Sequence, residues 1–138
     1  MKLFLDANVL VSVLNKEYPL FTYSSRVLSL VDDKRFRVYT SPLCLAIAFY
    51  FAEKKHGNTM ARKKMSLLTE KLLFTAIDEK TVLAVERNKK IHDFEDGLQY
   101  YSAIEKECKY IITEDKSDFY FSEIEVMGSK TFLEKHVF

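Results

Sequence analysis

Acidic side chains follow two short apolar runs that lie far apart in this 138-residue sequence. Asp6 comes directly after Leu3-Phe4-Leu5, and Asp115 comes shortly after Tyr110-Ile111-Ile112-Thr113. Both runs are typical of buried β-strands. Ligands bind beyond the carboxyl ends of the strands in an open α/β sheet, so both acids would lie at the mouth of such a crevice. Taken alone, Asp6 is better explained as the N-terminal cap of the helix that follows it.

A second pair of acids, Asp93 and Asp96, stands three residues apart at the start of a predicted helix. Both side chains can project from its first turn towards the same crevice. Asp93 is mainly a helix cap, because acids are favoured at that position. Asp96 is the better ligand candidate, since it lies inside the helix and Gly97 leaves room beside it. Two other acids have ordinary interpretations, Asp118 as a turn residue and Glu114 as a solvent-exposed side chain.

Carboxylates gathered in one place repel each other unless a cation neutralises them. Hard oxygen ligands of this type select Mg²⁺ or Mn²⁺. Such an ion can activate water and stabilise the charge that grows on phosphate oxygens, which suits phosphodiester hydrolysis. The sequence offers no competing metal site, because the three histidines share no spacing, and Cys44 and Cys108 lie in apolar surroundings typical of reduced, packed thiols.

The elements that must position these acids alternate between strand and helix along the whole chain. Predicted strands cover residues 3–5, 37–40, 74–77, 110–113 and 124–127. Predicted helices cover 7–15 and 22–33 and begin near 42, 58, 78, 93 and 129, and in the fifth of these Val82, Leu83 and Val85 are expected to be buried. The alternation predicts a single domain over residues 1–138, a three-layer α/β/α fold with a central parallel sheet of four to five strands.

Composition and charge set the class of protein. Hydrophobic residues make up 48% of the chain, enough for one substantial core. No apolar run approaches the roughly 20 residues of a membrane span, and no signal peptide is readable, so we expect a soluble cytoplasmic protein with no membrane partner. Residues 1–90 hold 16 Lys and Arg against 9 Asp and Glu, whereas residues 91–138 hold 5 against 11. This asymmetry fits a basic part that attracts a polyanion and an acidic part that binds a cation, although solvated helices would give the same count.

Four segments together resemble a PIN domain, the fold of many VapC-type toxins of bacterial toxin–antitoxin pairs. The segments are Phe4-Leu5-Asp6-Ala7-Asn8-Val9-Leu10, Ser41-Pro42-Leu43, Asp93-Phe94-Glu95-Asp96-Gly97-Leu98-Gln99 and Ile111-Ile112-Thr113-Glu114-Asp115-Lys116-Ser117-Asp118-Phe119. Their order and spacing carry the resemblance over nearly the whole length. The resemblance implies a ribonuclease that depends on Mg²⁺ or Mn²⁺ and acts on RNA. It further implies a homodimer and a small antitoxin protein that blocks the site.

The resemblance also assigns roles to individual residues. The implied metal ligands are Asp6, Asp96, Asp115 and Asp118, of which the first three are the implied catalytic residues. Asn8 matches the polar partner of the family's D-x-N motif. With Asn8, the expected supporting residues are Asp93 and Thr113.

One position departs from the family pattern. Between Ser41 and Tyr50 the family usually carries a metal-site Glu, sometimes an Asn, and here the alignment places Ile47. Glu53 does not replace it, because it lies six residues later on another side of the helix. Two interpretations follow: a ribonuclease, weakened or not, whose remaining acids and water hold the ion, or a non-catalytic PIN-like module that binds RNA or protein. A nuclease that acts on DNA is a third.

Aromatic residues offer a possible partner surface. The run Phe49-Tyr50-Phe51 and the residues Tyr18 and Tyr23 could line a dimer or antitoxin groove. Core packing is the more ordinary role of an aromatic stripe.

Overall fold

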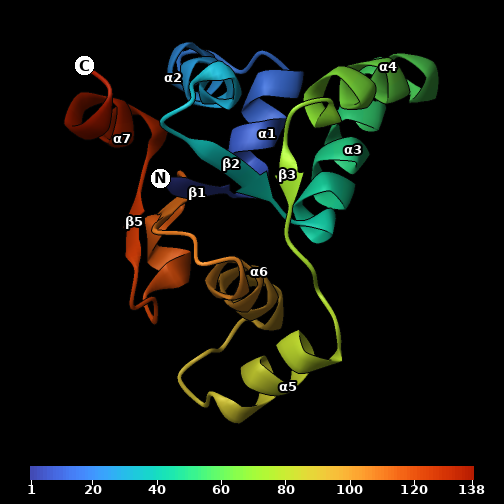
Figure 1. The fold of residues 1–138 in the computed structure, drawn as a ribbon. Coiled ribbons are helices and arrows are strands. Elements are labelled where there is room, and N and C mark those ends of the chain that lie inside the picture. Colours follow the sequence, from blue (N-terminus) through green and yellow to red (C-terminus); the bar gives the residue numbers. More distant parts are fainter.

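The computed structural model describes residues 1–138 and is built around a sheet of five parallel strands in the order β3-β2-β1-β4-β5. The strands are β1 (Lys2–Leu5), β2 (Arg37–Thr40), β3 (Leu73–Phe74), β4 (Tyr110–Ile112) and β5 (Glu125–Met127). The predicted parallel sheet is therefore confirmed, with five strands. The amino-terminal strand β1 lies at its centre (Figure 1).

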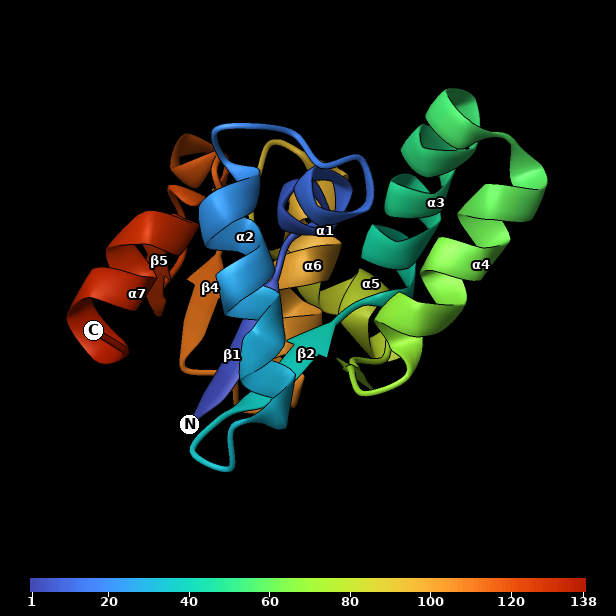
Figure 2. The same cartoon turned by 90° about the horizontal axis from the view of Figure 1, so that it is seen from above.

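Seven α-helices cover the sheet and complete the predicted α/β/α arrangement. They are α1 (Ala7–Leu14), α2 (Phe21–Leu28), α3 (Pro42–His56), α4 (Asn58–Thr69), α5 (Glu79–Arg87), α6 (Phe94–Glu105) and α7 (Ser129–His136). Helices α1, α2 and α7 lie on one side of the sheet and α6 lies on the other (Figure 1). Helices α3 and α4 pack against each other, with α3 beside α1, and α5 packs on α6 (Figure 2).

The register of β1 and β4 brings two distant parts of the chain together. Leu5 pairs with Ile112 at the carboxyl ends of the two strands. The Asp6 amide then donates to the Ile112 carbonyl at 3.0 Å, and the Thr113 amide donates to the Met127 carbonyl at 3.0 Å. The polar residues that follow β1 and β4 therefore leave the sheet side by side.

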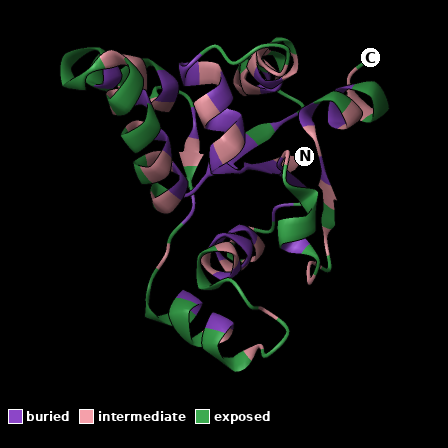
Figure 3. Ribbon diagram, turned by 180° about the vertical axis from the view of Figure 1, so that it is seen from behind, coloured by how far each residue is buried: buried purple, intermediate pink, exposed green.

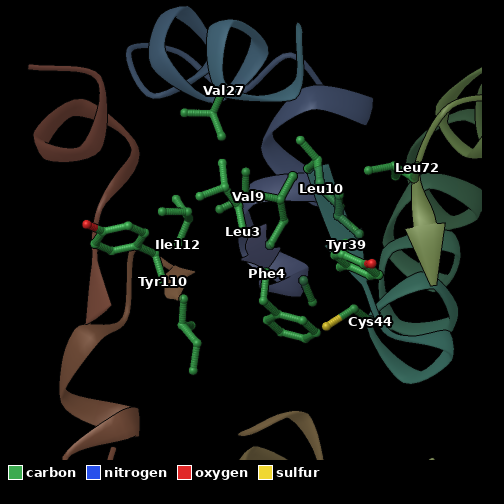
Figure 4. Close-up of a cluster of buried hydrophobic side chains, with 14 of the residues drawn as sticks. Leu3, Phe4, Val9, Leu10, Val27, Tyr39, Cys44, Leu72, Tyr110 and Ile112 are labelled. Atoms are coloured by element: carbon green, nitrogen blue, oxygen red, sulfur yellow. The ribbon is translucent and has the colours of Figure 1, made fainter. Parts of the chain in front are cut away.

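The core lies on both faces of β1. Leu3 and Phe4 are completely buried and point to opposite faces, as consecutive residues of a strand do (Figure 4). Cys44 lies beside the Phe4 ring, and both cysteines are buried and unpaired, as predicted. Burial raises the pKa of the Cys44 and Cys108 thiols to about 12, so both are inert.

Two predicted element boundaries are wrong. The third strand ends at Phe74 rather than at residue 77, because the chain leaves the sheet after the Thr75 amide bonds to the Thr40 carbonyl at 2.9 Å. The helix predicted over residues 22–33 ends at Leu28 and continues as a 3₁₀-helix, η1 (Ser29–Asp32).

The prediction that Val82 and Leu83 are buried is also wrong, although it holds for Val85. Each of the first two side chains is 37% exposed, whereas Val85 is 4% exposed. The reason is that α5 packs mainly on α6 and lies outside it, so most of its surface faces solvent (Figure 3).

None of the helices combines the length and the apolar character needed to cross a bilayer.

Candidate functional site

A pocket of about 360 Å³ lies at the carboxyl edge of the sheet, where β1 and β4 end. Six carboxylates line it, and no Lys, Arg or His does. The six are Asp6, Glu17, Glu95, Asp96, Asp115 and Asp118. The crevice predicted from the sequence is therefore present, and it contains four of the acids that the sequence singles out together with two that it does not.

Asp6 has two roles at the same time. Its Oδ1 atom accepts a hydrogen bond of 2.8 Å from the Ala7 amide, so it caps α1. Its Oδ2 atom accepts a hydrogen bond of 2.8 Å from the Thr113 hydroxyl. The cap and the pocket role, which the sequence presents as alternatives, are combined in one side chain because the two oxygens face different groups.

The Thr113 hydroxyl connects the first and fourth strands. It donates to Asp6 and accepts from Asn8 Nδ2 at 2.9 Å and from the Asp115 amide at 3.1 Å. Asn8 Nδ2 also lies 3.3 Å from Asp115 Oδ2, and Asn8 Oδ1 accepts from the Glu114 amide at 3.2 Å. A hydroxyl offers one donor and two acceptor sites, and all three are used here. Thr113 and Asn8 thus fix the acids that follow β1 and β4 relative to each other.

The two acids of α6 divide as expected. Asp93 caps the helix, since its Oδ1 atom accepts from the Asp96 amide at 3.1 Å, and it does not line the pocket. Asp96 lines the pocket from the first turn. Gly97 does not line the pocket, and the space left by its missing side chain lies toward α5. A Cβ atom at this position would lie 2.6 Å from Val85 Cγ1, so the glycine allows α6 to pack closely on α5.

Three carboxyl groups of this pocket have pKa values raised above the usual range, mainly by burial. Burial raises the pKa of Asp96 to about 7, and the neighbouring charges of Asp93 and Asp118 contribute. Burial also raises the pKa of Asp6 above its usual value, against the hydrogen bonds from Thr113 and Ala7. The pKa of Glu95 is raised by burial and by nearby acids. The pocket therefore concentrates negative charge that no side chain of the protein neutralises.

The donor set fits a hard divalent cation by charge and by ligand type, because carboxylate oxygens are the preferred ligands of Mg²⁺ and Mn²⁺. No three His, Cys, Asp or Glu side chains are already gathered as a metal-binding cluster. Water would complete the shell of an ion bound here, as it commonly does for Mg²⁺.

The segment after β4 carries two further acids. Asp118 lies in a 3₁₀-helix, η2 (Lys116–Phe119), and lines the pocket. Its amide donates to the Asp115 carbonyl at 3.0 Å. The expectation that Glu114 is solvent-exposed is wrong. It is half-buried, and its Oε1 atom accepts from the Ser129 amide at 2.9 Å, which ties the pocket segment to the start of α7.

The position that departs from the family pattern lies in the pocket wall. Ile47 lines this wall from α3, whereas Glu53 lies outside the pocket and accepts a hydrogen bond from Asn58.

Two acids of the pocket, Glu17 and Glu95, were not predicted from the sequence. Glu95 carries a signal, because it precedes Asp96 in the first turn of α6, but Glu17 lies in an irregular segment after α1 where no periodicity indicates its direction.

The chain is similar in sequence to one protein family and to one named relative. Residues 2–117 match the family model described as PIN domain. The chain is 29% identical over 137 residues to the Ribonuclease VapC1 of Aquifex aeolicus (strain VF5), covering 97% of this chain and 94% of the relative.

Solved structures share the fold at low sequence identity. The VapBC2 structure from Rickettsia felis, bound to a DNA fragment from their promoter, gives a TM-score of 0.70 at 17% identity and covers 92% of this chain and 97% of that chain. VapC20 of Mycobacterium tuberculosis, a Sarcin-Ricin loop cleaving toxin, gives a TM-score of 0.66 at 16% identity and covers 89% of this chain and 98% of that chain. VapBC-1 of nontypeable Haemophilus influenzae gives 0.70 at 18% identity and covers 94% and 99%.

Proposed function

This chain belongs to the PIN-domain family, and on that basis we propose that it is a ribonuclease that hydrolyses RNA phosphodiester bonds as the toxin of a toxin–antitoxin pair. The observation that carries the proposal is the pocket that six carboxylates line without a cationic side chain. Such a pocket costs free energy in the isolated protein, and a bound cation would recover that cost. The named activity of the Aquifex relative supports RNA as the substrate.

Asp6, Asp96 and Asp115 would hold a Mg²⁺ or Mn²⁺ ion, with Asp118 beside them. When bound, the ion supplies Lewis acidity that activates water and stabilises charge on the phosphate oxygens. The chain contributes orientation: Thr113 holds Asp6, and Asn8 holds Asp115. Burial raises the pKa of Asp96 to about 7, and a bound cation would favour its ionised form.

A second candidate is a non-catalytic PIN-like module that binds RNA or protein. Ile47 favours it, because this apolar side chain lines the pocket at the position where the family usually provides a carboxylate. Calorimetry with Mn²⁺ separates the two functions. Ion uptake that Asp6→Asn weakens supports the nuclease, whereas RNA binding with no measurable ion uptake supports the binding module.

Partners of this chain are also proposals. An antitoxin protein and a second copy of the chain would each bury apolar surface, and α4 presents two large apolar side chains to solvent, Met60 at 45% and Leu67 at 70% exposure. The solved VapBC structures of the same fold support an antitoxin partner. We place the protein in the cytoplasm, where its RNA substrate and its antitoxin would be found.

The experiment that tests the function is cleavage of a labelled single-stranded RNA by the purified chain in Mg²⁺, in Mn²⁺ and in EDTA. We expect cleavage only with a metal, and a loss of at least about 100-fold in Asp6→Asn, which keeps the shape of the side chain and removes its charge. Glu53→Gln is the matched control, since it removes a charge outside the pocket. The proposal fails if the wild-type chain cleaves no RNA with either metal, or if Asp6→Asn cleaves as well as the wild type. A DNA strand of the same sequence tests the third interpretation.

A further inference from the structure

We propose that single-stranded RNA approaches the acidic pocket over a neighbouring surface on which Arg87, Lys89 and Lys90 bind its phosphates and the ring of Tyr120 stacks on one base. This inference rests on the proposed function, because it names how the substrate of that pocket is held. It concerns residues that neither the acidic pocket nor the cap of α6 uses.

The phosphate-binding part is a hollow at the end of α5. It has a volume of about 470 Å³ and is lined by Ala84, Arg87, Asn88, Lys89, Lys90 and Tyr101. Three of these side chains are cationic and none is acidic, and the three cations are exposed and take part in no salt bridge. Cations that the protein leaves without a counter-charge in one hollow are suited to an anionic ligand.

The loop that carries these cations is held in place. Asn88 Nδ2 donates to the Tyr101 hydroxyl at 3.0 Å, and Asn88 Oδ1 accepts from the Lys90 amide at 3.1 Å. The Ile91 amide also bonds to the Asn88 carbonyl at 3.1 Å. Lys89 and Lys90 therefore extend from an ordered turn, which lies between α5 and α6 at the far side of α6 from the sheet (Figure 1).

Tyr120 is an exposed ring fixed on several sides. It is 56% exposed, yet its hydroxyl accepts from the His92 amide at 3.1 Å and donates to the Lys90 carbonyl. Its ring stacks on His92, with centroids 5.8 Å apart and planes at 25°, and meets Phe121 edge-on at 5.3 Å. Phe121 in turn packs edge-on against the buried ring of Tyr100 at 5.2 Å.

A ring held in this way loses little conformational entropy when a ligand binds to it. Single-stranded RNA offers unstacked bases, and stacking on an aromatic side chain is the common way in which proteins hold them. The hydrogen bond from Tyr120 to Lys90 sets the ring directly beside the basic hollow. A strand could thus place its phosphates on the cations and a base on the ring at the same time.

The two segments that meet at the Tyr120 ring also reach the acidic pocket. Asp118, two residues before Tyr120, lines that pocket, and so do Glu95 and Asp96, which follow His92 on the other segment. Phosphates would bind the basic hollow, which repels cations, while the cation would bind the acidic pocket, which repels phosphates. A strand that crosses Tyr120 therefore leads from one to the other.

The test measures binding rather than cleavage. A fluorescein-labelled single-stranded RNA of mixed sequence is titrated with the full chain in EDTA, and its anisotropy is recorded at several salt concentrations. Tyr120→Leu is compared with Tyr120→Phe, which keeps the ring but loses the hydroxyl. Tyr50→Leu is the matched control, because Tyr50 is 55% exposed and also lies near a lysine, with Lys54 Nζ 5.4 Å from its ring centroid.

We expect Tyr120→Leu to weaken RNA binding roughly 5- to 150-fold, the range measured for loss of one stacked base. Tyr120→Phe should retain most of the affinity, and Tyr50→Leu should match the wild type. The logarithm of the RNA association constant falls with log salt, and each phosphate contact on a single strand contributes about 0.7 to the steepness of that fall. Replacing Lys89 and Lys90 by Ala should therefore make the slope shallower by about 1.4. The control with the same charge change replaces Arg62 and Lys63 by Ala and should leave the slope unaltered.

Three results would overturn the inference. They are wild-type affinity in Tyr120→Leu, an equal loss in Tyr120→Leu and Tyr120→Phe, and equal salt slopes in the two double-alanine variants. Wild-type affinity in Tyr120→Leu is the result expected if this surface binds a protein instead of RNA. An equal loss in Tyr120→Leu and Tyr120→Phe is the result expected if Tyr120 only holds the loop in place through its hydroxyl. Thermal unfolding of each variant establishes that it is folded.

This outcome is independent of the proposed catalytic function. Cleavage of RNA in Mn²⁺, together with RNA binding that Tyr120→Leu does not change, would reject the proposed RNA-binding surface and support the proposed nuclease function. Binding that depends on Tyr120 without any cleavage would keep the surface and reject the nuclease.

Discussion

Replacing Asp96 by Asn should stabilise the metal-free protein at neutral and alkaline pH. Burial and the surrounding acids raise the pKa of Asp96 from 3.8 to about 7 in the folded chain. A carboxyl group whose pKa is raised by folding destabilises the folded state once it must ionise there. The penalty is absent below the unfolded pKa of 3.8, grows as the pH rises, and is complete above about pH 7.

The size of the effect follows from the same change in pKa. A rise of this extent corresponds to about 4 kcal/mol in a fully buried group. The Asp96 carboxyl group is only partly buried, so solvent screening reduces the expected gain to about 1 to 2 kcal/mol. We therefore expect the free energy of unfolding of Asp96→Asn to exceed that of the wild type by about this amount at pH 8, and by almost nothing at pH 4.

Urea unfolding in EDTA at pH 4, 6 and 8 measures this directly. Glu53→Gln serves as the control, because Glu53 lies outside the pocket and should show no such dependence on pH. Adding Mn²⁺ at pH 8 should stabilise the wild type more than Asp96→Asn, since only the wild type offers the carboxylate to the ion. Equal stability of the two chains at pH 8, or a gain in Asp96→Asn that is the same at pH 4, would refute the electrostatic reasoning.

Three further substitutions test the framework around the pocket. Thr113→Val removes the hydroxyl that bonds to Asp6 and two other partners, and should lower the free energy of unfolding by about 1 to 3 kcal/mol in urea, whereas Thr113→Ser should restore most of it. Gly97→Ala should lower the free energy of unfolding by about 1 to 3 kcal/mol, because its methyl group would lie 2.6 Å from Val85. Val85→Ala should destabilise the Gly97→Ala variant less than it destabilises the wild type, and additive losses of stability would contradict the packing argument. Ile47→Glu adds a carboxylate to the pocket wall and should raise Mn²⁺ affinity in calorimetry while lowering stability in EDTA; unchanged affinity would mean that the side chain at this position does not reach the ion.

The sequence allowed the sheet to be predicted well, because the strand at Leu3 and the strand at Ile111 are short, apolar and followed by acids. Such patterns fix which residues are buried and which end of a strand carries chemistry. They do not fix where an edge strand ends: the third strand stops at Phe74, and the bond from the Thr75 amide to the Thr40 carbonyl is the last that links it to the second strand. Exposure of Val82 was unpredictable for a related reason, since the periodicity of a helix indicates an apolar face but not whether another element covers it.

The candidate site was predicted in part. Asp6, Asp96 and Asp115 line one pocket, as the strand ends and the helix start indicated, and so does Asp118, which only the resemblance to a PIN domain implied as a ligand; their roles as ligands stay predictions. Glu17 could not be found, because it lies in an irregular turn where side-chain direction depends on tertiary packing. The basic hollow and Tyr120 were likewise beyond the sequence, since 30 residues separate Tyr120 from the Lys90 carbonyl that it contacts.

The bond between Asp6 and Thr113 also affects when the pocket can form during synthesis. These residues are 107 positions apart, so the pocket requires a loop of most of the chain to close. The Glu114 contact with Ser129 then adds the start of the last helix to the same unit. A chain still emerging from the ribosome therefore holds Asp6 without the hydroxyl that orients it, and the pocket forms only after Thr113 has been made and has paired with Asp6.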